Sequence, residues 1–489
     1  MKKYWGTLAV GILAFLPQLC MSELYVGCRT VDLTPPRAVA LDGQMGTRIS
    51  TEVLTPMTAN IISLESREGE KMLDACVFVS FDLVGIRPEL DSAIREEFAT
   101  LLPEYDPQRL ILCATHTHTA PVADKNKYHI PESADCMHPE EYVLWAAQKT
   151  APAIVEAIRS AVPAQYSYGM DFAVVAQCRR AVYENGTAVM YGNTNQKTFR
   201  AIEAMEDHDV NTLFFWDKSD KLLAMFVNVS CPAQEVEGLS QLHADFWHPT
   251  RRMLKKRLGE DVVVAAICGA AGDVSPHTLY RKEAEARMAC LRKMSRLDEI
   301  GRRISNAVFN TYDLAFQSKR SNPVLKHEYR VLEIPQHRIT KPEYEQSKAE
   351  AEALQKQLAK DPNKTRLFTW ANTIVQRYEK QQNDPNATFS VPIHVVRLGD
   401  TVFATNPFEL FTAYGVQMKA RSRATQTFVV QLTDGCGICG TASSAGYLPT
   451  EDAYRGGGYS AIVKSITVGP AGGQKLVEES LRIMNGMFE

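Results

Sequence analysis

The sequence has little that would mark a nucleic-acid-binding or membrane-spanning protein. Its 54 Lys and Arg residues nearly balance 57 Asp and Glu residues, for a formal net charge of −3. Near-neutral charge without a run of basic residues gives no electrostatic attraction for nucleic acid or an anionic membrane surface. After residue 19 no stretch is apolar and long enough to span a bilayer. Internal repeats and flexible linkers are also lacking, which favours one large folded unit.

Cysteine is present, but not in a pattern that builds a structural metal cage. The chain has 11 Cys, of which Cys436 and Cys439 form the one closely spaced pair. A structural zinc site needs four ligands, and no second CxxC pair completes one. The pair could instead be a disulfide or two packed thiols. An exported chain could oxidise some of its thiols, and the sequence leaves the pairing open.

The N-terminus has the pattern of an export signal. Lys2 and Lys3 precede an apolar run over residues 4–19, which is short for a membrane span. Such a start predicts a signal peptide over residues 1–22 and a periplasmic or secreted protein with no remaining membrane segment. An uncleaved anchor is the alternative. A lipid anchor at Cys20 is disfavoured, because residues 16–19 lack the small residues usual before a lipidated cysteine.

Short apolar runs alternate with helical patterns along the chain. Residues 75–82, 109–114 and 262–268 are typical of buried strands, and residues 140–162 form a helical pattern with a strong apolar face. This alternation predicts an α/β fold. Two polar helical stretches, residues 343–360 and 364–382, predict a surface hairpin that could serve as a lid.

Two histidines follow the buried strand at residues 109–114. Alternate residues of an extended chain share a face, so His116 and His118 are expected to point the same way. Strand ends in α/β sheets commonly bind ligands. Two imidazoles there suit a metal ligand beside a proton-transfer or positioning group. The alternative is a pair of polar histidines on an exposed strand end, and the spacing favours the metal centre.

A glycine-rich loop, residues 269–277, follows another buried strand. Small residues allow backbone N–H groups to approach a substrate and form an anion-binding nest. Ser275 would present its hydroxyl there, with Asp273 and His277 close by. The alternative is an ordinary turn in which the Asp and Ser side chains bond their own backbone.

Two further segments have equally plain alternatives. Asn406 and Glu409 could be a helix N-cap and its capping-box partner, or Glu409 could be a metal ligand. Tyr447, Tyr454 and Tyr459 surround several glycines, a pattern typical of a binding loop but also of ordinary turns.

Taken in order, these segments resemble the neutral, non-lysosomal ceramidase family. THTHTAP (115–121) is similar to the family's THTHSGP, and GDVSP (272–276) to its nucleophile loop. PFELFT (407–412) is similar to PGEFT, and GYLPTEDAY (446–454) to GYVTTxEEY. The resemblance implies an α/β catalytic domain over residues 23–489, with a large mixed sheet, flanking helices and an inserted helical hairpin at 341–385. The family's C-terminal β-sandwich domain is not expected, because the chain ends soon after the tyrosine segment.

The resemblance also implies a Zn²⁺ cofactor. The family usually supplies a second histidine ligand after its central hairpin, and here Cys231 occupies that place. Thiolate is a good zinc ligand, so the site could survive the change, although the metal could also have been lost. The predicted ligands are therefore His116, Cys231, Glu409 and Tyr447, with His243 or His248 as alternatives to the cysteine.

The same resemblance assigns the groups around the substrate. His118 would shuttle protons, Arg179 and Tyr459 would stabilise the oxyanion, and Ser275 would attack or position water. Arg180 fits almost as well as Arg179. The expected reaction is hydrolysis of an amide, or less readily an ester, in a lipid or related conjugate.

Two other functions stay open at this point. One is hydrolysis of a glycan or glycoconjugate, since the β-sandwich domain and one ligand depart from the family pattern. The other is a non-catalytic binding protein that has kept the pocket. All three readings predict a small-molecule, lipid or glycoconjugate partner and no nucleic acid.

Overall fold

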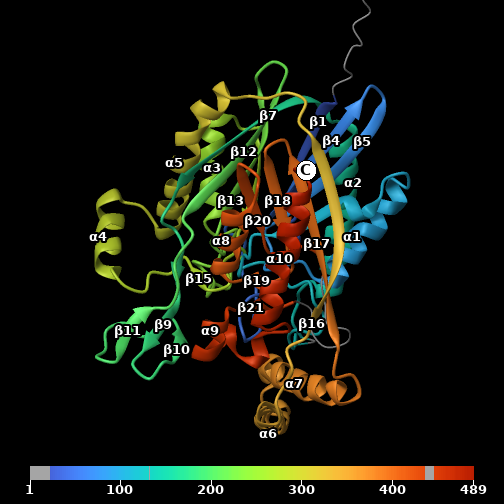
Figure 1. The fold of residues 1–489 in the computed structure, drawn as a ribbon. Coiled ribbons are helices and arrows are strands. Elements are labelled where there is room, and N and C mark those ends of the chain that lie inside the picture. Colours follow the sequence, from blue (N-terminus) through green and yellow to red (C-terminus); the bar gives the residue numbers. More distant parts are fainter. Residues whose placement is uncertain (1–21, 132, 436–444) are drawn as a thin grey trace, which may run out of the picture.

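The computed structural model describes residues 22–131, 133–435 and 445–489. The predicted signal peptide and the Cys436/Cys439 pair lie outside these residues. In the described chain no helix combines the length and apolar character needed to cross a membrane. The predicted α/β class, with a large mixed sheet and flanking helices, is confirmed (Figure 1).

The largest element is an eight-stranded sheet. In spatial order its strands are β14 (Val263–Cys268), β13 (Leu222–Val229), β12 (Asp209–Asp217), β7 (Val162–Phe172), β1 (Glu23–Asp32), β4 (Thr58–Glu68), β5 (Lys71–Phe81) and β6 (Leu110–Ala114). The β5–β6 and β13–β14 pairs are parallel and the others antiparallel. The predicted buried runs are β5, β6 and β14, whose inner residues are shielded on both faces.

A four-stranded sheet packs against one face of the large sheet. It consists of β16 (Leu325–Pro335), β17 (Thr388–Leu398), β18 (Thr401–Thr405) and β20 (Gln426–Val430). Aromatic rings fill the space between the sheets. The ring of Phe403 on β18 lies 4.9 Å from Phe78 and 5.2 Å from Phe226, both on the large sheet. This shared core fixes the ends of β6 and β18 relative to each other.

Helices cover the outer faces, which gives four layers in the order helix, sheet, sheet, helix (Figure 1). On the large sheet, α1 (Pro88–Leu101) and α2 (Pro139–Arg159) cover one half, and α3 (Trp247–Leu258) and α5 (Arg296–Gln317) cover the other. The small sheet is covered by α8 (Thr412–Arg421) and α10 (Pro470–Gly486).

The charged segment after the glycine-rich loop forms two helices, α4 (Lys282–Arg292) and α5. Lys293 has a left-handed backbone with φ of 53°, which ends α4. Ser295 then caps α5, its Oγ accepting a hydrogen bond from the Asp298 N–H at 3.0 Å. Charged residues are frequent on both sides of this break, so the break is not visible in the sequence.

Short ladders complete the fold. They pair β2 (Ala40–Leu41) with β3 (Arg48–Ile49), β8 (Gln177–Cys178) with β15 (Val274–Ser275), β19 (Glu409–Leu410) with β21 (Tyr447–Leu448), and β9 (Arg180–Tyr183) with β10 (Ala188–Met190) and β11 (Phe199–Ile202). A short helix, α9 (Glu451–Gly456), follows β21.

The predicted polar hairpin is present as α6 (Lys341–Leu358) and α7 (Thr365–Asn383). It is anchored to the chain that follows β21. The Lys464 ammonium lies 2.8 Å from the Glu350 carboxylate on α6. Arg377 on α7 donates hydrogen bonds to the Ile466 and Thr467 carbonyls at 2.8 and 3.1 Å. In this structure the hairpin is therefore packed against the chain that follows β21 and is not an open lid.

Candidate active site

A pocket lies beside the ends of β6 and β18 and collects side chains from distant parts of the sequence. His116, His118, Glu409, Tyr447 and Tyr459 all line it. These are five of the eight residues that the sequence predicted for the site. The pocket is therefore the candidate active site.

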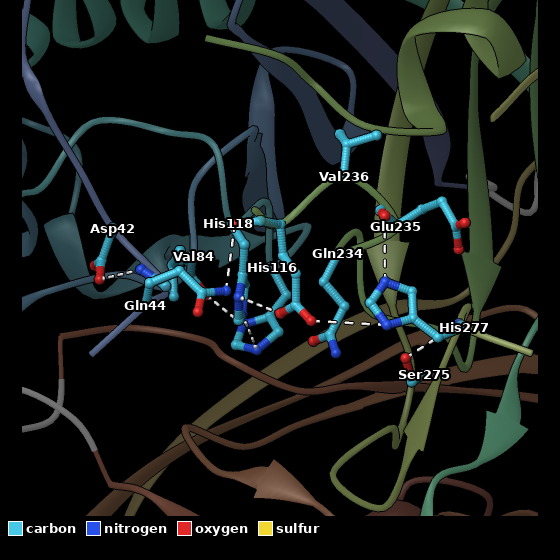
Figure 2. Close-up of polar contacts among 12 residues, drawn as sticks. Asp42, Gln44, Val84, His116, His118, Gln234, Glu235, Val236, Ser275 and His277 are labelled. Atoms are coloured by element: carbon cyan, nitrogen blue, oxygen red, sulfur yellow. Dashed lines mark hydrogen bonds and ion pairs between the residues drawn. The ribbon is translucent and has the colours of Figure 1, made fainter. Parts of the chain in front are cut away.

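His116 does not lie on an extended strand, which corrects the reasoning from alternate residues. Strand β6 ends at Ala114, and His116 has a left-handed φ of 67°. The turn places its Nδ1 2.6 Å from the Val84 carbonyl, to which it donates. The two histidine rings still meet edge to face, with 3.2 Å between the Nε2 atoms of His116 and His118 (Figure 2).

Glycine is required where the loop at residues 42–46 passes His118. Gly43 has φ of +99°, and a Cβ there would lie 2.5 Å from His118 Cγ. Arg48 fixes the same approach by donating to the carbonyl oxygens of Asp42 and His118, each at 2.7 Å.

Sequence reasoning missed Glu237, which orients His118. Its Oε2 lies 3.1 Å from His118 Nδ1, and its Oε1 lies 3.7 Å from His277 Nδ1. A carboxylate behind an imidazole fixes the tautomer and orientation of the ring. The one available signal was its position six residues after Cys231, which stands where the family usually has a histidine ligand.

Glu409 and Tyr447 are neighbours in the parallel ladder between β19 and β21. Glu409 is not part of a helix, because α8 begins only at Thr412, so the capping-box alternative is wrong. Asn406 instead accepts a hydrogen bond from the Phe408 N–H at 3.1 Å. Burial alone would raise the pKa of Glu409, but contacts with His116 and Tyr447 lower it to about 2.

The atoms that meet at the centre of the site are all electron-pair donors. Burial lowers the pKa of His118, so its ring is neutral at pH 7, and a proton on Nδ1 facing Glu237 leaves a lone pair on Nε2. His116 uses its Nδ1 proton at Val84, which leaves a lone pair on its Nε2 as well. Glu409 Oε2 lies 3.4 Å from that nitrogen. These lone pairs repel unless a proton or a metal cation lies between them.

The chemistry of these donors fits zinc, which binds imidazole nitrogen and carboxylate oxygen. Across the described residues, no three His, Cys, Asp or Glu side chains are gathered into a metal-binding group. A metal at His116 and Glu409 therefore needs the Tyr447 phenol as a further ligand. Burial, followed by the charge of Glu409, raises the pKa of Tyr447 well above its usual value.

The two adjacent arginines have different surroundings. Arg179 faces the site, and its Nη2 donates to the Tyr447 hydroxyl at 3.1 Å and to the Gly272 carbonyl at 3.0 Å. Arg180 pairs with the Glu203 carboxylate and donates to the Ala453 carbonyl at 3.0 Å, away from the histidines. Of the two, only Arg179 contacts a residue that lines the pocket, and its own side chain does not line it.

Ser275 is fully buried and does not line the pocket. Its Oγ accepts a hydrogen bond from the Tyr191 hydroxyl at 3.0 Å. It also accepts one from the His277 N–H at 3.2 Å (Figure 2). The glycine-rich loop packs against protein backbone, since a Cβ at Gly272 would lie 2.3 Å from the Glu409 carbonyl oxygen. The loop thus supports Glu409, and a nucleophilic role for Ser275 stays a prediction.

Cys231, the predicted fourth ligand, lies in the apolar core under α3 and α5. Its Sγ is 3.8 Å from the Pro232 carbonyl oxygen, and burial raises the pKa of the thiol well above its usual value. His243 and His248 face each other with ring centroids 6.4 Å apart. None of the three lines the pocket, so the identity of a fourth ligand stays a prediction.

Comparison with known proteins gives similarity in fold. No protein-family model matches the chain, and no match was found among curated proteins. The neutral ceramidase from Pseudomonas aeruginosa is similar in structure, with a TM-score of 0.67 and 14% identity over 95% of this chain and 74% of that chain. A ceramidase complexed with C2 has a TM-score of 0.66 and 14% identity, covering 95% of this chain and 75% of that chain. At this identity the likeness establishes the fold alone.

Proposed function

We propose that the chain is a ceramidase-like, zinc-dependent hydrolase that cleaves an amide bond in a lipid or related conjugate, and that it is exported. The observation that carries the proposal is that His118 Nε2 and Glu409 Oε2 lie 3.2 and 3.4 Å from His116 Nε2 in one pocket. The similarity of the fold to two ceramidases supports it.

Zinc would be held by His116, Glu409 and Tyr447, and Cys231 stays a predicted fourth ligand. When bound, zinc would acidify a water molecule and polarise a substrate carbonyl. The Val84 carbonyl supports this role by holding the proton on His116 Nδ1, which leaves Nε2 free.

The protein groups around the metal divide the remaining work. His118 would accept a proton at Nε2, and Glu237 would stabilise the resulting imidazolium through Nδ1. The Tyr459 hydroxyl would donate to the substrate oxygen as negative charge develops there. Arg179 would act through Tyr447, to which it donates a hydrogen bond.

The test combines metal content with turnover. The purified chain is expected to hold about one zinc and to hydrolyse N-acyl amides. His116→Ala and Glu409→Gln are expected to lose the zinc and to lower kcat by about 100-fold or more. His138→Ala, at an exposed histidine before α2, should change neither quantity.

Two outcomes would contradict the proposal. A chain without zinc that gains nothing when zinc is added would favour a binding protein. Turnover of acylated sugars without turnover of amides would favour a glycoconjugate hydrolase.

A further inference from the structure

The pocket has a second group of charged side chains beside the reaction centre. Arg87, Lys127 and Arg366 all line it, and they come from the loop after β5, the loop before α2, and the start of α7. None of these residues belongs to the four motifs that carry the family resemblance. The cations therefore need their own explanation.

Two of the three cations are held in place from behind by one buried carboxylate. Asp42 Oδ2 accepts from Arg87 Nη2 at 3.1 Å, and Asp42 Oδ1 contacts the Lys127 ammonium. The Tyr128 hydroxyl and the Gly43 N–H also donate to Asp42 Oδ1, at 3.3 and 2.6 Å. One carboxylate shared by two cations fixes their positions and leaves positive charge facing the pocket.

Other acidic groups do not cancel this charge. Asp124 lies near enough to Arg87 to interact with its charge. Together with Asp42, this places two carboxylates beside the three cations. Asp434 lines the pocket, but its carboxylate is engaged by His394 and Arg95 at 2.9 and 2.8 Å. Glu409 belongs to the reaction centre. The cationic group therefore keeps a net positive charge.

Arg366 makes no hydrogen bond or ion pair with any residue that the structure describes. It nevertheless lies close to the other cations, since burial together with repulsion from Arg87 and Arg366 lowers the pKa of Lys127 to about 8. Placing like charges together in a half-enclosed pocket is costly unless a ligand compensates them.

The helix that carries Arg366 is fixed over the reaction centre. Trp370 lies one turn further along α7, on the same face as Arg366. Its ring packs 5.6 Å from that of Tyr459, which lines the pocket. The Lys464 ammonium lies 4.7 Å from the Trp370 ring on α7 and also pairs with Glu350 on α6. Both helices of the hairpin are therefore fixed to the segment that carries Lys464.

We propose that the substrate is an anion, and that Arg366, Lys127 and Arg87 bind its carboxylate, sulfonate or phosphate group while the amide lies at His116 and Glu409. This proposal rests on the proposed function, because it assumes that the pocket is the substrate site. It assigns the α6–α7 hairpin a direct role in specificity through Arg366. Planar guanidinium groups suit such anions because they can bind two oxygens at once.

The test uses amides that share one acyl chain and differ only in the group at the far end. N-acylglycine carries a carboxylate, N-acyltaurine a sulfonate, N-acyl phosphoethanolamine a phosphate and N-acylethanolamine no charge. Dissociation constants are measured by calorimetry on the full chain with the matching ketones, in which CH2 replaces the amide N–H, so that no turnover accompanies binding. At least one anionic ketone should bind ten or more times more tightly than the neutral one, and the ranking of the three anions identifies the preferred group.

The matched variants are Arg366→Gln and Lys364→Gln, which remove the same charge two residues apart. Lys364 contacts Gln357 and Asp361 and does not line the pocket. Arg366→Gln should weaken binding of the preferred anion at least tenfold and of the neutral ketone clearly less, and Arg366→Lys should restore part of the loss. Lys364→Gln should leave the binding of both unchanged.

Equal affinity for the neutral and anionic ketones would overturn the proposal, as would equal losses for both in Arg366→Gln. If the anions bind selectively but no amide is cleaved, the anion site stands and the proposed reaction is wrong. If neutral amides are bound and cleaved as well as anionic ones, the reaction stands and the anion site is wrong.

Discussion

Individual residues decide whether the two histidines can meet. Gly43→Ala adds a methyl group 2.5 Å from His118 Cγ at a position with φ of +99°. We expect it to destabilise the fold by about 1–2 kcal/mol from backbone strain and to lower kcat by displacing the His118 ring. Gly46→Ala is the matched control, because a Cβ there has open space around it. Chemical denaturation and steady-state kinetics on both variants check this, and equal behaviour of the two would contradict it.

Glu237 offers a second test at the same scale. Glu237→Gln removes the charge that lies 3.1 Å from His118 Nδ1, so kcat should fall by about 10-fold or more with KM little changed. The control is Glu235→Gln in the same loop. Burial raises the pKa of Glu235 to about 8, so its carboxyl is mostly protonated at pH 7 and glutamine resembles it. A Glu237→Gln enzyme with normal kcat would remove this residue from the mechanism.

At this scale the sequence picked out residues that share a pocket but not their contacts. His116, Glu409 and Tyr447 line the same pocket, as the family resemblance implied, and their roles stay predictions. Arg179 and Arg180 could not be separated, because neighbouring residues in extended chain point to opposite sides and only strand pairing decides which side faces the site. Glu237 was missed because its role depends on a contact with a residue more than one hundred positions away.

Among the elements, α5 carries a carboxylate whose charge stabilises the fold. Glu299 lies 2.9 Å from each of Arg302 and Arg303, and hydrogen bonds from these arginines lower its pKa to about 2. Because the pKa is lower in the folded state, this stabilisation is fully present above about pH 4.5 and is lost as pH falls toward 2.

Glu299→Gln should therefore lower the free energy of unfolding at pH 7 by about 1–3 kcal/mol and flatten its fall between pH 4.5 and 2. Denaturant titrations across this range measure both effects. Glu283→Gln, at an exposed position on α4, supplies the control. Parallel curves for Glu299→Gln and the natural chain would show that the cluster contributes nothing to acid sensitivity.

Elements with a strong hydrophobic pattern were predicted well, and short ones were not. The buried strands β5, β6 and β14 and the helix α2 match their predicted ranges closely. The ladders β19–β21 and β8–β15 have two residues in each strand, too few for any periodicity. The β19–β21 ladder places Glu409 and Tyr447 in the pocket, so this part of the fold, which positions the site, was among the least visible in the sequence.

On the scale of the whole molecule, the two sheets act as one unit through their aromatic core. Phe403 is fully buried, with its ring 4.5 Å from Phe428 and 4.9 Å from Phe78. Phe403→Ala should lower the free energy of unfolding by about 3–5 kcal/mol and reduce activity, because His116 follows one sheet and Glu409 follows the other. Leu314→Ala is the control, since Leu314 is 69% exposed. Separate unfolding transitions for the two sheets would contradict this coupling.

The wide spread of the pocket residues along the chain also bears on when the protein can act. They extend from Gly43 to Tyr459, so most of the polypeptide must be synthesised before the pocket can exist. A chain that is still emerging from the ribosome, or is threaded unfolded through a membrane, has none of these side chains assembled. If the chain is exported unfolded, the proposed hydrolase would be inactive inside the cell that makes it. This inactivity would not require an inhibitor or a pro-segment.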